Sequence, residues 1–280
     1  MKRVLCEKLP QPHQPTVLSE AEATHLTRVF RLKDGDRVEA MDGKGFHAAV
    51  TLRTRNGVPR LEFLEKPVSS SDEGLQCVPV TLEMAVLKGD AMEWVVEKAV
   101  ELGIQTLVPV VTAHTVVQLD KKGPEAFRER WQKIADQALK QCGRLDRLEI
   151  KTPVELQELL AGSSQAPRLW CDESARDHAG SLFGRINSMV SSTSNTSGNT
   201  SGDSAANTAD NSSENSSRDE SLRDVRILIG PEGGWSELER DILSRSTQNI
   251  PVSLGPLVLR AETAAIFALS LVSAALRESK

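Results

Sequence analysis

The order of apolar runs and helical patterns after residue 77 restricts the fold of this chain more than any other feature. Short apolar runs that predict strands lie at 78–87, 104–111, 168–171 and 225–229. Apolar residues at helical spacing predict helices after Asp90, after Pro124 and from Ala261 to Leu276. Strands that alternate with helices predict a parallel sheet covered on both faces. The fold class predicted for this part of the chain is therefore α/β.

Residues 1–67 have a different pattern, because turn signals are frequent and the apolar runs between them are short. The turn signals are Lys33–Asp36, Asp42–Gly45 and Asn56–Gly57. This spacing predicts a small β-barrel or sandwich. The small, polar residues 68–74 predict a linker. We therefore expect one domain at 1–70 and a second domain at 77–280.

A segment rich in serine, threonine and asparagine interrupts the second domain. It runs from Ser188 to Ser217, and its only strongly apolar residues are Met189 and Val190. Such a stretch cannot bury enough apolar surface to offset the entropy lost on ordering. We therefore expect a disordered insertion near 187–221.

Composition restricts the location and the ligands of the protein. No apolar run approaches the roughly 20 residues of a membrane span, and Pro10, Pro12 and Pro15 interrupt a signal-peptide helix. We expect a cytoplasmic protein without membrane contact. The net charge is −5, but residues 1–67 are net basic, so we expect the basic surface there. The four cysteines and five histidines are scattered, and their spacing predicts no metal site.

A loop with three glycines and one proline follows the predicted strand 225–229. It reads Gly230-Pro-Glu-Gly-Gly234, and Ser236 with Glu239 then predicts a capping box for a helix. The loop has neither the GxGxxG pattern nor a Walker lysine, so it does not favour phosphate binding. Glycines do let a ligand approach backbone N–H and C=O groups. A tight strand–helix turn is the alternative interpretation.

A second loop of this kind precedes the last predicted helix. It pairs Gly255 with Pro256 and places Arg260, Glu262 and Thr263 at the start of the helix. A glutamate there is favoured by the helix dipole. Loops at the carboxyl ends of parallel strands can form one crevice. We therefore expect the two loops to line a common binding site.

The segments IGPEGGWSELE (229–239) and LGPLVLRAETAAIFAL (254–269) together closely resemble the C-terminal signature of RsmE-type methyltransferases. This family belongs to the SPOUT class and methylates N3 of a uridine in small-subunit (16S) ribosomal RNA. The segments 25–36, 42–45, 97–103 and 141–144 agree with the resemblance. It implies a PUA-like β-barrel, then a SPOUT-type parallel sheet with a trefoil knot, and a homodimer. The implied partner is small-subunit ribosomal RNA or the assembled small ribosomal subunit.

The resemblance further implies that the two loops bind S-adenosylmethionine. The residues carried over to this chain are Ile229, Gly230, Pro231, Glu232, Gly233, Gly234, Leu254, Gly255, Leu259, Arg260, Ala261, Glu262 and Thr263. Uracil N3 is a poor nucleophile until it loses its proton. We expect Arg260 to stabilise the resulting anion and Glu262 to orient the base or accept the proton. A structural Arg–Glu pair at a helix start is the alternative for Glu262.

Contacts with RNA phosphates are expected at basic residues of both domains. The candidates are Arg28, Arg31 and Lys33 in the first domain and Lys88, Lys98 and Arg144 in the second. A solvated surface charge is the alternative for each, and Lys98 has Glu101 three residues away as a partner. The chain departs from the family where Leu257 and His114 replace basic residues, which weakens the prediction of RNA contacts there.

Two other functions remain open at this point. The first is a non-catalytic RNA-binding protein with a degenerate cofactor pocket, against which the glycines of both loops argue. The second is a nucleotide hydrolase that uses the glycine-rich loop. The second lacks a Walker lysine and a cluster of metal ligands.

Overall fold

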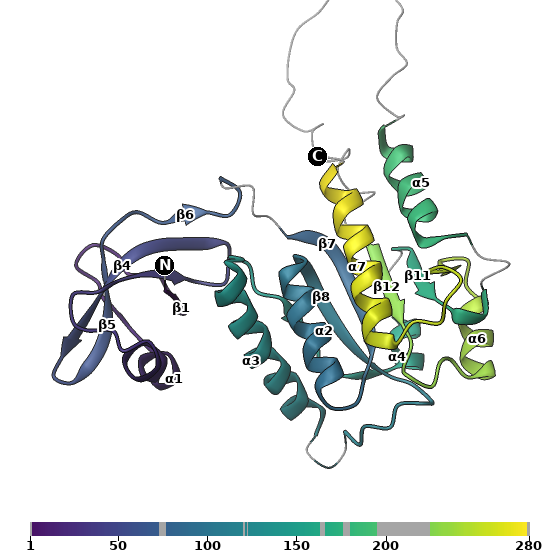
Figure 1. The fold of residues 1–280 in the computed structure, drawn as a ribbon, viewed down its shortest axis with the longest axis horizontal. Coiled ribbons are helices and arrows are strands. Elements are labelled where there is room, and N and C mark those ends of the chain that lie inside the picture. The colour runs from purple at the N-terminus through teal and green to yellow at the C-terminus, as the bar shows by residue number, and fades with distance from the viewer. Residues whose placement is uncertain are drawn as a thin grey trace, which may run out of the picture. The chain divides into compact units, whose positions relative to one another are not determined.

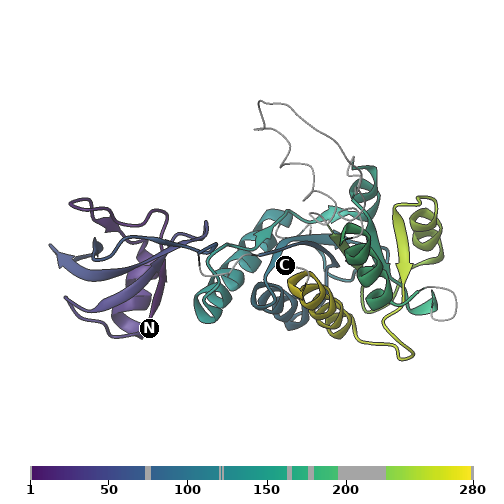
Figure 2. The same ribbon diagram turned by 90° about the horizontal axis from the view of Figure 1, so that it is seen from above.

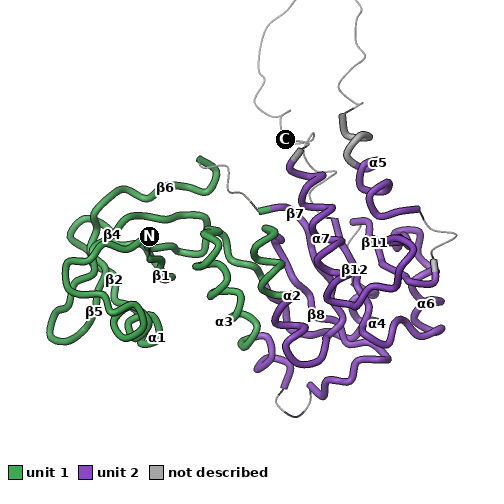
Figure 3. Tube along the Cα trace, viewed as in Figure 1, with its two compact units in different colours: residues 1–77, 96–103, 129–149 green, residues 78–95, 104–128, 150–280 purple. Residues whose placement is uncertain are grey.

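The computed structural model describes residues 2–72, 77–119, 121, 123–162, 166–175, 180–194 and 225–278. The chain divides into two units (Figure 3). Unit 1 comprises 1–77, 96–103 and 129–149, and unit 2 comprises 78–95, 104–128 and 150–280. Parts of two later helices thus group with the N-terminal residues. The domain limits 1–70 and 77–280 stay a prediction.

Unit 1 contains a six-stranded sheet with the order β1-β3-β4-β5-β2, and β6 pairs with β4. Its strands are β1 (Arg3–Leu5), β2 (Thr16–Val17), β3 (Arg37–Met41), β4 (Phe46–Arg55), β5 (Val58–Phe63) and β6 (Val68–Ser69). Val38, Val50 and Leu61 alternate with more exposed residues and are completely buried. Period-two burial of this kind places one face of the sheet on a core. The prediction of a small β-rich unit is confirmed.

A short helical segment covers part of that core. It consists of α1 (Glu20–Thr24) and the π-helical turn η1 (His25–Val29). The hydroxyl of Ser19 accepts a hydrogen bond from the N–H of Glu22 at 3.3 Å, which satisfies a free N–H group at the helix start. Leu26 is completely buried in the core cluster of the sheet.

Unit 2 contains a seven-stranded sheet with the order β10-β8-β7-β12-β11-β13, and β9 also pairs with β8. Its strands are β7 (Val78–Ala85), β8 (Ile104–Val111), β9 (Glu149–Ile150), β10 (Val154–Glu155), β11 (Arg168–Cys171), β12 (Val225–Ile229) and β13 (Asn249–Val252). The strands of that order pair in parallel throughout. In β7 the adjacent Leu82 and Glu83 are both completely buried, so both faces of the sheet are covered. The α/β prediction is confirmed.

The helices after residue 77 include the predicted α2 (Asp90–Glu101), α3 (Pro124–Cys142), α6 (Glu237–Ser244) and α7 (Ala261–Glu278). They also include three helical segments that the sequence did not predict, α4 (Leu156–Ala161), the 3₁₀ turn η2 (Glu173–Ala175) and α5 (Leu182–Ser194). Gly103 and Gly143 follow α2 and α3 with φ of 80° and 82°, a conformation that favours glycine at a helix end. Helix α7 packs against β7 and β12, and α5 lies beside α7 (Figures 1 and 2).

The predicted disordered insertion needs one correction at its start. Helix α5 continues to Ser194, although the insertion was predicted to begin near residue 187. The buried Leu182 and Ile186 are four residues apart and hold one face of the helix in the unit. The remainder of the predicted insertion, 195–221, lies outside the described residues. Among the helices that the structure describes, none combines the length and the hydropathy of a membrane span.

A buried ionic cluster connects four of the parallel strands. Glu83 of β7 is completely buried, and Arg168 of β11 donates hydrogen bonds to both of its carboxylate oxygens. Arg168 also donates to the side-chain oxygen of Asn249 in β13, at 2.8 Å. Arg226 of β12 approaches the same carboxylate, with Nη1 at 3.4 Å from Oε1. One carboxylate thus fixes the alignment of β7, β12 and β11, and Asn249 adds β13.

Glu83→Ala is expected to destabilise the protein strongly. The substitution leaves the guanidinium of Arg168 buried without its counter-charge, which costs about 3–5 kcal/mol. The control Glu101→Gln removes the half-exposed pair of Glu101 with Lys98 and should cost at most about 1 kcal/mol. Urea unfolding followed by circular dichroism measures both free energies. Equal losses in the two variants would contradict the assigned role of Glu83.

Candidate functional site

The loops after three adjacent parallel strands line one cavity of about 620 Å³. Strand β11 lies between β12 and β13, and all three end at the same edge of the sheet. The first predicted loop follows β12 and the second follows β13. Both loops contribute to the wall of the cavity, and Cys171, Asp172 and Glu173 contribute from the end of β11. The expected common site of the two loops is therefore present in the geometry.

The glycines of the first loop are required by close packing. A Cβ atom on Gly230 would lie 2.9 Å from the ring of Trp235, and one on Gly233 would lie 3.0 Å from Cβ of His114. Gly234 has a φ of 67°, and a Cβ there would lie 2.5 Å from Oε1 of Glu173. The loop is therefore enclosed by Trp235 at its own end and by two other segments, and a larger residue would displace one of these neighbours.

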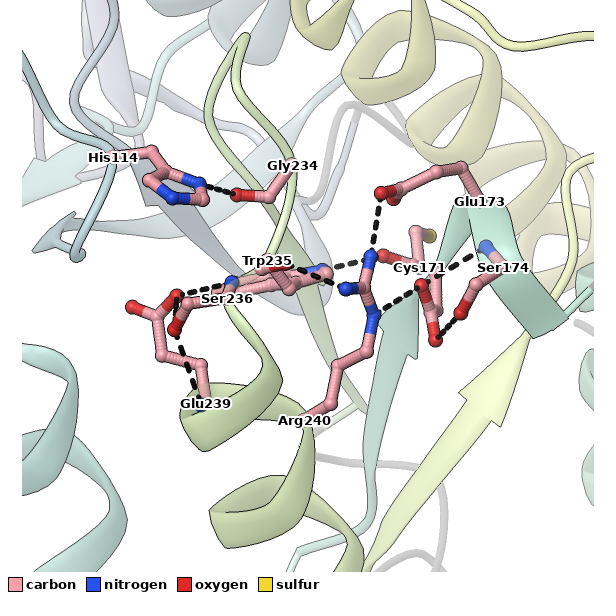
Figure 4. A network of polar contacts seen from close by, with 10 residues as sticks. His114, Cys171, Glu173, Ser174, Gly234, Trp235, Ser236, Glu239 and Arg240 are labelled. Carbon is pink, nitrogen blue, oxygen red and sulfur yellow. Dashed lines mark hydrogen bonds and ion pairs between the residues drawn. The ribbon is translucent and has the colours of Figure 1, made fainter.

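Trp235 anchors the first loop to the end of β11. Its side chain is 2 % exposed and packs at an angle of 80° to Trp170, with 6.3 Å between the ring centroids. Its Nε1–H donates a hydrogen bond to the carbonyl oxygen of Cys171 at 2.9 Å (Figure 4). Because a buried indole N–H needs such an acceptor, this bond ties the loop after β12 to the end of β11.

Glu239 and His114 connect the first loop with the residues after β8. The predicted capping box is confirmed, since Glu239 accepts from the N–H of Ser236 at 2.9 Å and Ser236 caps the helix in return. The other carboxylate oxygen of Glu239 accepts the N–H of Ala113 at 2.8 Å. His114 donates from Nδ1 to the carbonyl oxygen of Gly234 at 2.9 Å (Figure 4).

Arg240 in the first turn of α6 holds the acidic residues after β11. Its guanidinium donates to Asp172 at 3.2 Å, to Glu173 at 2.7 Å and to the carbonyl oxygen of Trp235 at 2.7 Å (Figure 4). These bonds neutralise the two carboxylates that line the cavity. They also fix the loops after β11 and β12 relative to each other, so hydrogen bonds and ion pairs within the protein organise this wall.

The second loop is more open than the first. Gly255 has a φ of 119°, and a Cβ there would meet no atom within 4 Å, so glycine is required for the backbone conformation alone. The hydroxyl of Ser253 accepts the N–H of Gly255 at 3.2 Å. Leu257 and Val258 are 75 % and 68 % exposed. This wall therefore presents apolar side chains that a bound ligand could cover.

Arg260 and Glu262 line the cavity and carry charges. The carbonyl oxygen of Arg260 accepts the N–H of Ala264 at 2.8 Å, which begins helix α7. Within the described part of the chain, neither side chain forms an ion pair or hydrogen bond with protein. The predicted alternative of a structural Arg260–Glu262 pair is therefore not formed there.

Cys171 lines the cavity, but its thiol is not reactive. Burial raises the pKa of Cys171 to about 12, so the thiol stays protonated and unreactive at neutral pH. Among the described residues, no group of His, Cys, Asp and Glu side chains could hold a metal ion. The cavity thus offers backbone polar groups, apolar walls and two free charges, which suit binding and alignment of a ligand.

A second cavity of about 720 Å³ is also lined by residues of the first loop. It is lined by Lys88, the segment 113–116, Glu232 and Gly233, and the last two residues also line the first cavity. The carboxylate of Glu232 accepts the backbone N–H of Lys88 at 3.0 Å. The tip of the glycine-rich loop is therefore a common wall of the two cavities.

Comparison with known proteins decides which family carries this arrangement. A family model described as an RNA methyltransferase domain matches residues 75–273, and a model described as an RNA methyltransferase PUA domain matches residues 18–58. The chain belongs to the RNA methyltransferase family. The match covers the parallel sheet and both loops of the first cavity.

Individual members of the family are similar over nearly the whole chain. The Bacillus subtilis protein named ribosomal RNA small subunit methyltransferase E is 28 % identical over 254 residues, which are 90 % of this chain and 87 % of that protein. A Legionella pneumophila protein solved with the bound cofactor SAM has a TM-score of 0.75 and 25 % identity, and covers 98 % of this chain and 97 % of its own. Methyltransferase E of Neisseria gonorrhoeae, solved with S-adenosyl methionine, has a TM-score of 0.72 and 22 % identity, with 96 % and 95 % covered.

Almost all the residues predicted to bind the cofactor line the first cavity. They are Ile229, Gly230, Pro231, Glu232, Gly233, Gly234, Leu254, Gly255, Leu259 and Ala261. Thr263 is exposed on α7 and is not among the lining residues. Asp172 and Glu173 were missed, although they directly follow a predicted strand. The rule that ligands bind beyond the carboxyl ends of parallel strands would have included them.

The basic residues predicted to contact RNA differ in accessibility. Arg28, Arg31 and Lys33 are exposed in unit 1, and Lys88 is exposed at the second cavity. Lys98 pairs with Glu101 at 2.7 Å, as the alternative interpretation proposed. Arg144 is only 7 % exposed, and its guanidinium lies 3.4 Å from the carbonyl oxygen of Val100. Its placement does not support a phosphate contact, because the polar head is covered.

Gly230→Ala is expected to distort the first loop. The added methyl group would meet the buried ring of Trp235 at 2.9 Å, and such overpacking costs about 1–3 kcal/mol. The control Gly184→Ala lies in helix α5, where the nearest atom is the hydroxyl of Ser181 at 3.2 Å, and alanine favours a helix. Urea unfolding monitored by tryptophan fluorescence compares them. If Gly230→Ala is as stable as Gly184→Ala, the packing explanation of the glycine is wrong.

Proposed function

We propose that this protein uses S-adenosylmethionine to methylate N3 of a specific uridine in small-subunit (16S) ribosomal RNA. The observation that carries the proposal is the shared cavity of two glycine–proline loops, in a chain of the RNA methyltransferase family. The cavity volume of about 620 Å³ lies within the usual range of small-molecule sites, about 300–1,000 Å³. The names of the relatives support methylation of small-subunit ribosomal RNA, and one of them was solved with S-adenosyl methionine.

The lining residues fit an adenosyl group. Backbone N–H and C=O groups at Gly230–Gly234 and Leu254–Gly255 can contact a flat base at close range, because glycines leave the main chain uncovered. Leu257 and Val258 supply exposed apolar surface that would cover the ligand and exclude water. When bound, S-adenosylmethionine supplies an electrophilic methyl group on its sulfonium.

The residues of this chain would align and activate the uracil. Alignment of a reacting pair can contribute about 7–11 kcal/mol at most. Arg260 is exposed at the cavity and holds a free positive charge, which would stabilise the anion formed when N3 loses its proton. Glu262 lies two residues further and would orient the base or accept the proton.

The acceptor nucleotide would enter through the second cavity. That cavity shares Glu232 and Gly233 with the first, so a base there would lie next to the cofactor loop. Lys88 would contact a phosphate at its edge. The ring of His114 is held by its hydrogen bond to Gly234. His114 replaces a basic residue of the family, so this chain would make a weaker contact with RNA there.

The same proposal assigns roles to the two domains and predicts the substrate, the location and the homodimer. Residues 1–70 would act as a PUA-like RNA-binding domain and 77–280 as the methyltransferase domain, with the trefoil knot that the SPOUT resemblance implies. The substrate would be ribosomal RNA or the assembled small subunit, in the cytoplasm. Helix α7 exposes 44 % of Phe267, and this face would pair with the same face of a second copy in a homodimer.

Arg260→Ala is expected to lower the methylation rate by about 100-fold or more, because it removes the charge that stabilises the uracil anion. Affinity for S-adenosylmethionine, measured by calorimetry, should stay nearly unchanged. The control Arg277→Ala removes an exposed arginine of the same helix, one that bonds to Ser273, and should leave the rate unchanged. A normal methylation rate for Arg260→Ala would exclude the assigned role.

The function itself is tested by mass spectrometry of ribosomal RNA from cells that lack this protein. We expect the loss of one 3-methyluridine from small-subunit RNA and its restoration by the purified protein with S-adenosylmethionine. The alternative, a non-catalytic RNA-binding protein with a degenerate pocket, predicts no heat of binding at millimolar cofactor. RNA of unchanged methylation together with absent cofactor binding would favour that alternative.

A further inference from the structure

Unit 1 carries a groove that none of the predicted site residues lines. The groove has a volume of about 730 Å³. Its walls come from three segments of unit 1, namely 7–16 before and at β2, the turn 42–46 before β4, and 63–67 after β5. Four prolines of these segments, Pro10, Pro12, Pro15 and Pro67, line it. Prolines restrict the backbone, so the walls lose little entropy when a ligand binds.

Two aromatic rings lie in this groove, and one of them is held in an exposed position. Phe46 is 44 % exposed, and Phe63 is half-buried. The carboxylate of Asp42 accepts the N–H groups of Lys44 at 2.7 Å and of Phe46 at 3.1 Å. The N–H of Asp42 donates to the carbonyl oxygen of Phe46 at 3.1 Å, which closes the turn. The ring of Phe46 is therefore presented on a rigid turn.

Three lysines line the same groove as these rings, and their charges are free. Lys8, Lys44 and Lys66 are exposed, and within the described residues none of them forms an ion pair. Two other lysines of unit 1 are in ion pairs, Lys98 with Glu101 and Lys140 with Glu22. The carboxylates that line the groove are those of Glu7 and Asp42. Three positive charges against two negative ones, one of which already accepts two N–H groups, favour an anionic ligand.

We propose that this groove binds an unpaired segment of ribosomal RNA, with one base stacked on Phe46 and phosphates beside Lys8, Lys44 and Lys66. The proposal rests on the proposed function, which makes RNA the substrate. Exposed aromatic rings flanked by cations are the usual platform for single-stranded nucleic acid. A duplex hides the faces of its bases, and an acidic peptide would leave the ring of Phe46 without a partner. The groove is lined by none of Arg28, Arg31 and Lys33.

The first test measures the stacking contact. The full-length protein is titrated into a fluorescent oligouridine of roughly 12 nucleotides, and anisotropy gives the affinity. Phe46→Leu keeps an apolar side chain but removes the ring, and should weaken binding about 5-fold to 140-fold. The matched control Phe183→Leu changes an exposed phenylalanine of α5 and should have no effect. A duplex of the same length should bind wild type and Phe46→Leu equally.

The second test measures the phosphate contacts through their dependence on salt. The triple variant K8Q/K44Q/K66Q should lower the slope of log affinity against log salt by about 2, since each phosphate contact with a single strand contributes about 0.7. The control K121Q/K133Q/K151Q removes the same charge at three exposed lysines outside the groove. Its slope should stay close to that of the wild type.

These outcomes are separable from a failure of the proposed function. Each variant is also assayed for thermal unfolding, for S-adenosylmethionine binding and for KM toward small-subunit RNA. If the wild type methylates RNA but the groove variants keep its KM, affinity and salt slope, the groove proposal is wrong and the function stands. Photocrosslinking of wild type to an oligomer with 4-thiouridine should label the groove segments, and cross-links confined to other segments would overturn the proposal. Absent methylation by the wild type would instead refute the function.

Discussion

The buried carboxylate of Glu83 is the interaction on which the arrangement of the parallel sheet depends. Arg168 reaches it from β11 across the intervening β12, and Arg226 of β12 adds a second cation. Asn249 extends the cluster to β13. A buried charge without a partner is far more costly than a lost surface pair, so this cluster strongly disfavours other alignments of these strands. The loops after β11, β12 and β13 meet in one cavity only because the strands end in register.

The two loops of that cavity differ in how their shape is maintained. The first loop is enclosed by Trp235, His114 and Glu173, and its glycines are the residues that leave room for these neighbours. Arg240 then neutralises the acidic residues beside it. The second loop depends on the backbone freedom of Gly255 and leaves Leu257 and Val258 exposed. A rigid wall opposite an open apolar wall suits a ligand that is first positioned and then covered.

The charged side chains of unit 2 differ in whether they have partners. Glu83, Asp172 and Glu173 all have arginine partners. Arg260 and Glu262 line the cavity without such partners in the described part of the chain. A free cation beside the proposed cofactor site matches a reaction in which a neutral base becomes an anion. The unpaired lysines of the groove in unit 1 would in the same way provide positive charge for RNA phosphates. Lys88 would do so at the proposed acceptor cavity.

Much of this architecture was predictable from local patterns. The sequence alone determined the features that depend on residues close together in the chain, because hydrogen bonds and apolar periodicity within a few residues govern such features. They are the strands at 104–111, 168–171 and 225–229, the capping box of Ser236 and Glu239, and the two glycine–proline loops. Tertiary structure decided the placement of β11 between β12 and β13, the strand Asn249–Val252 with its proline, and the roles of Asp172 and Glu173. It also decided that Arg144 is buried and that Phe46 and its neighbour Lys44 share a groove with the distant Lys8 and Lys66. These features depend on the pairing and packing of segments far apart in the chain, whose energies no local pattern contains.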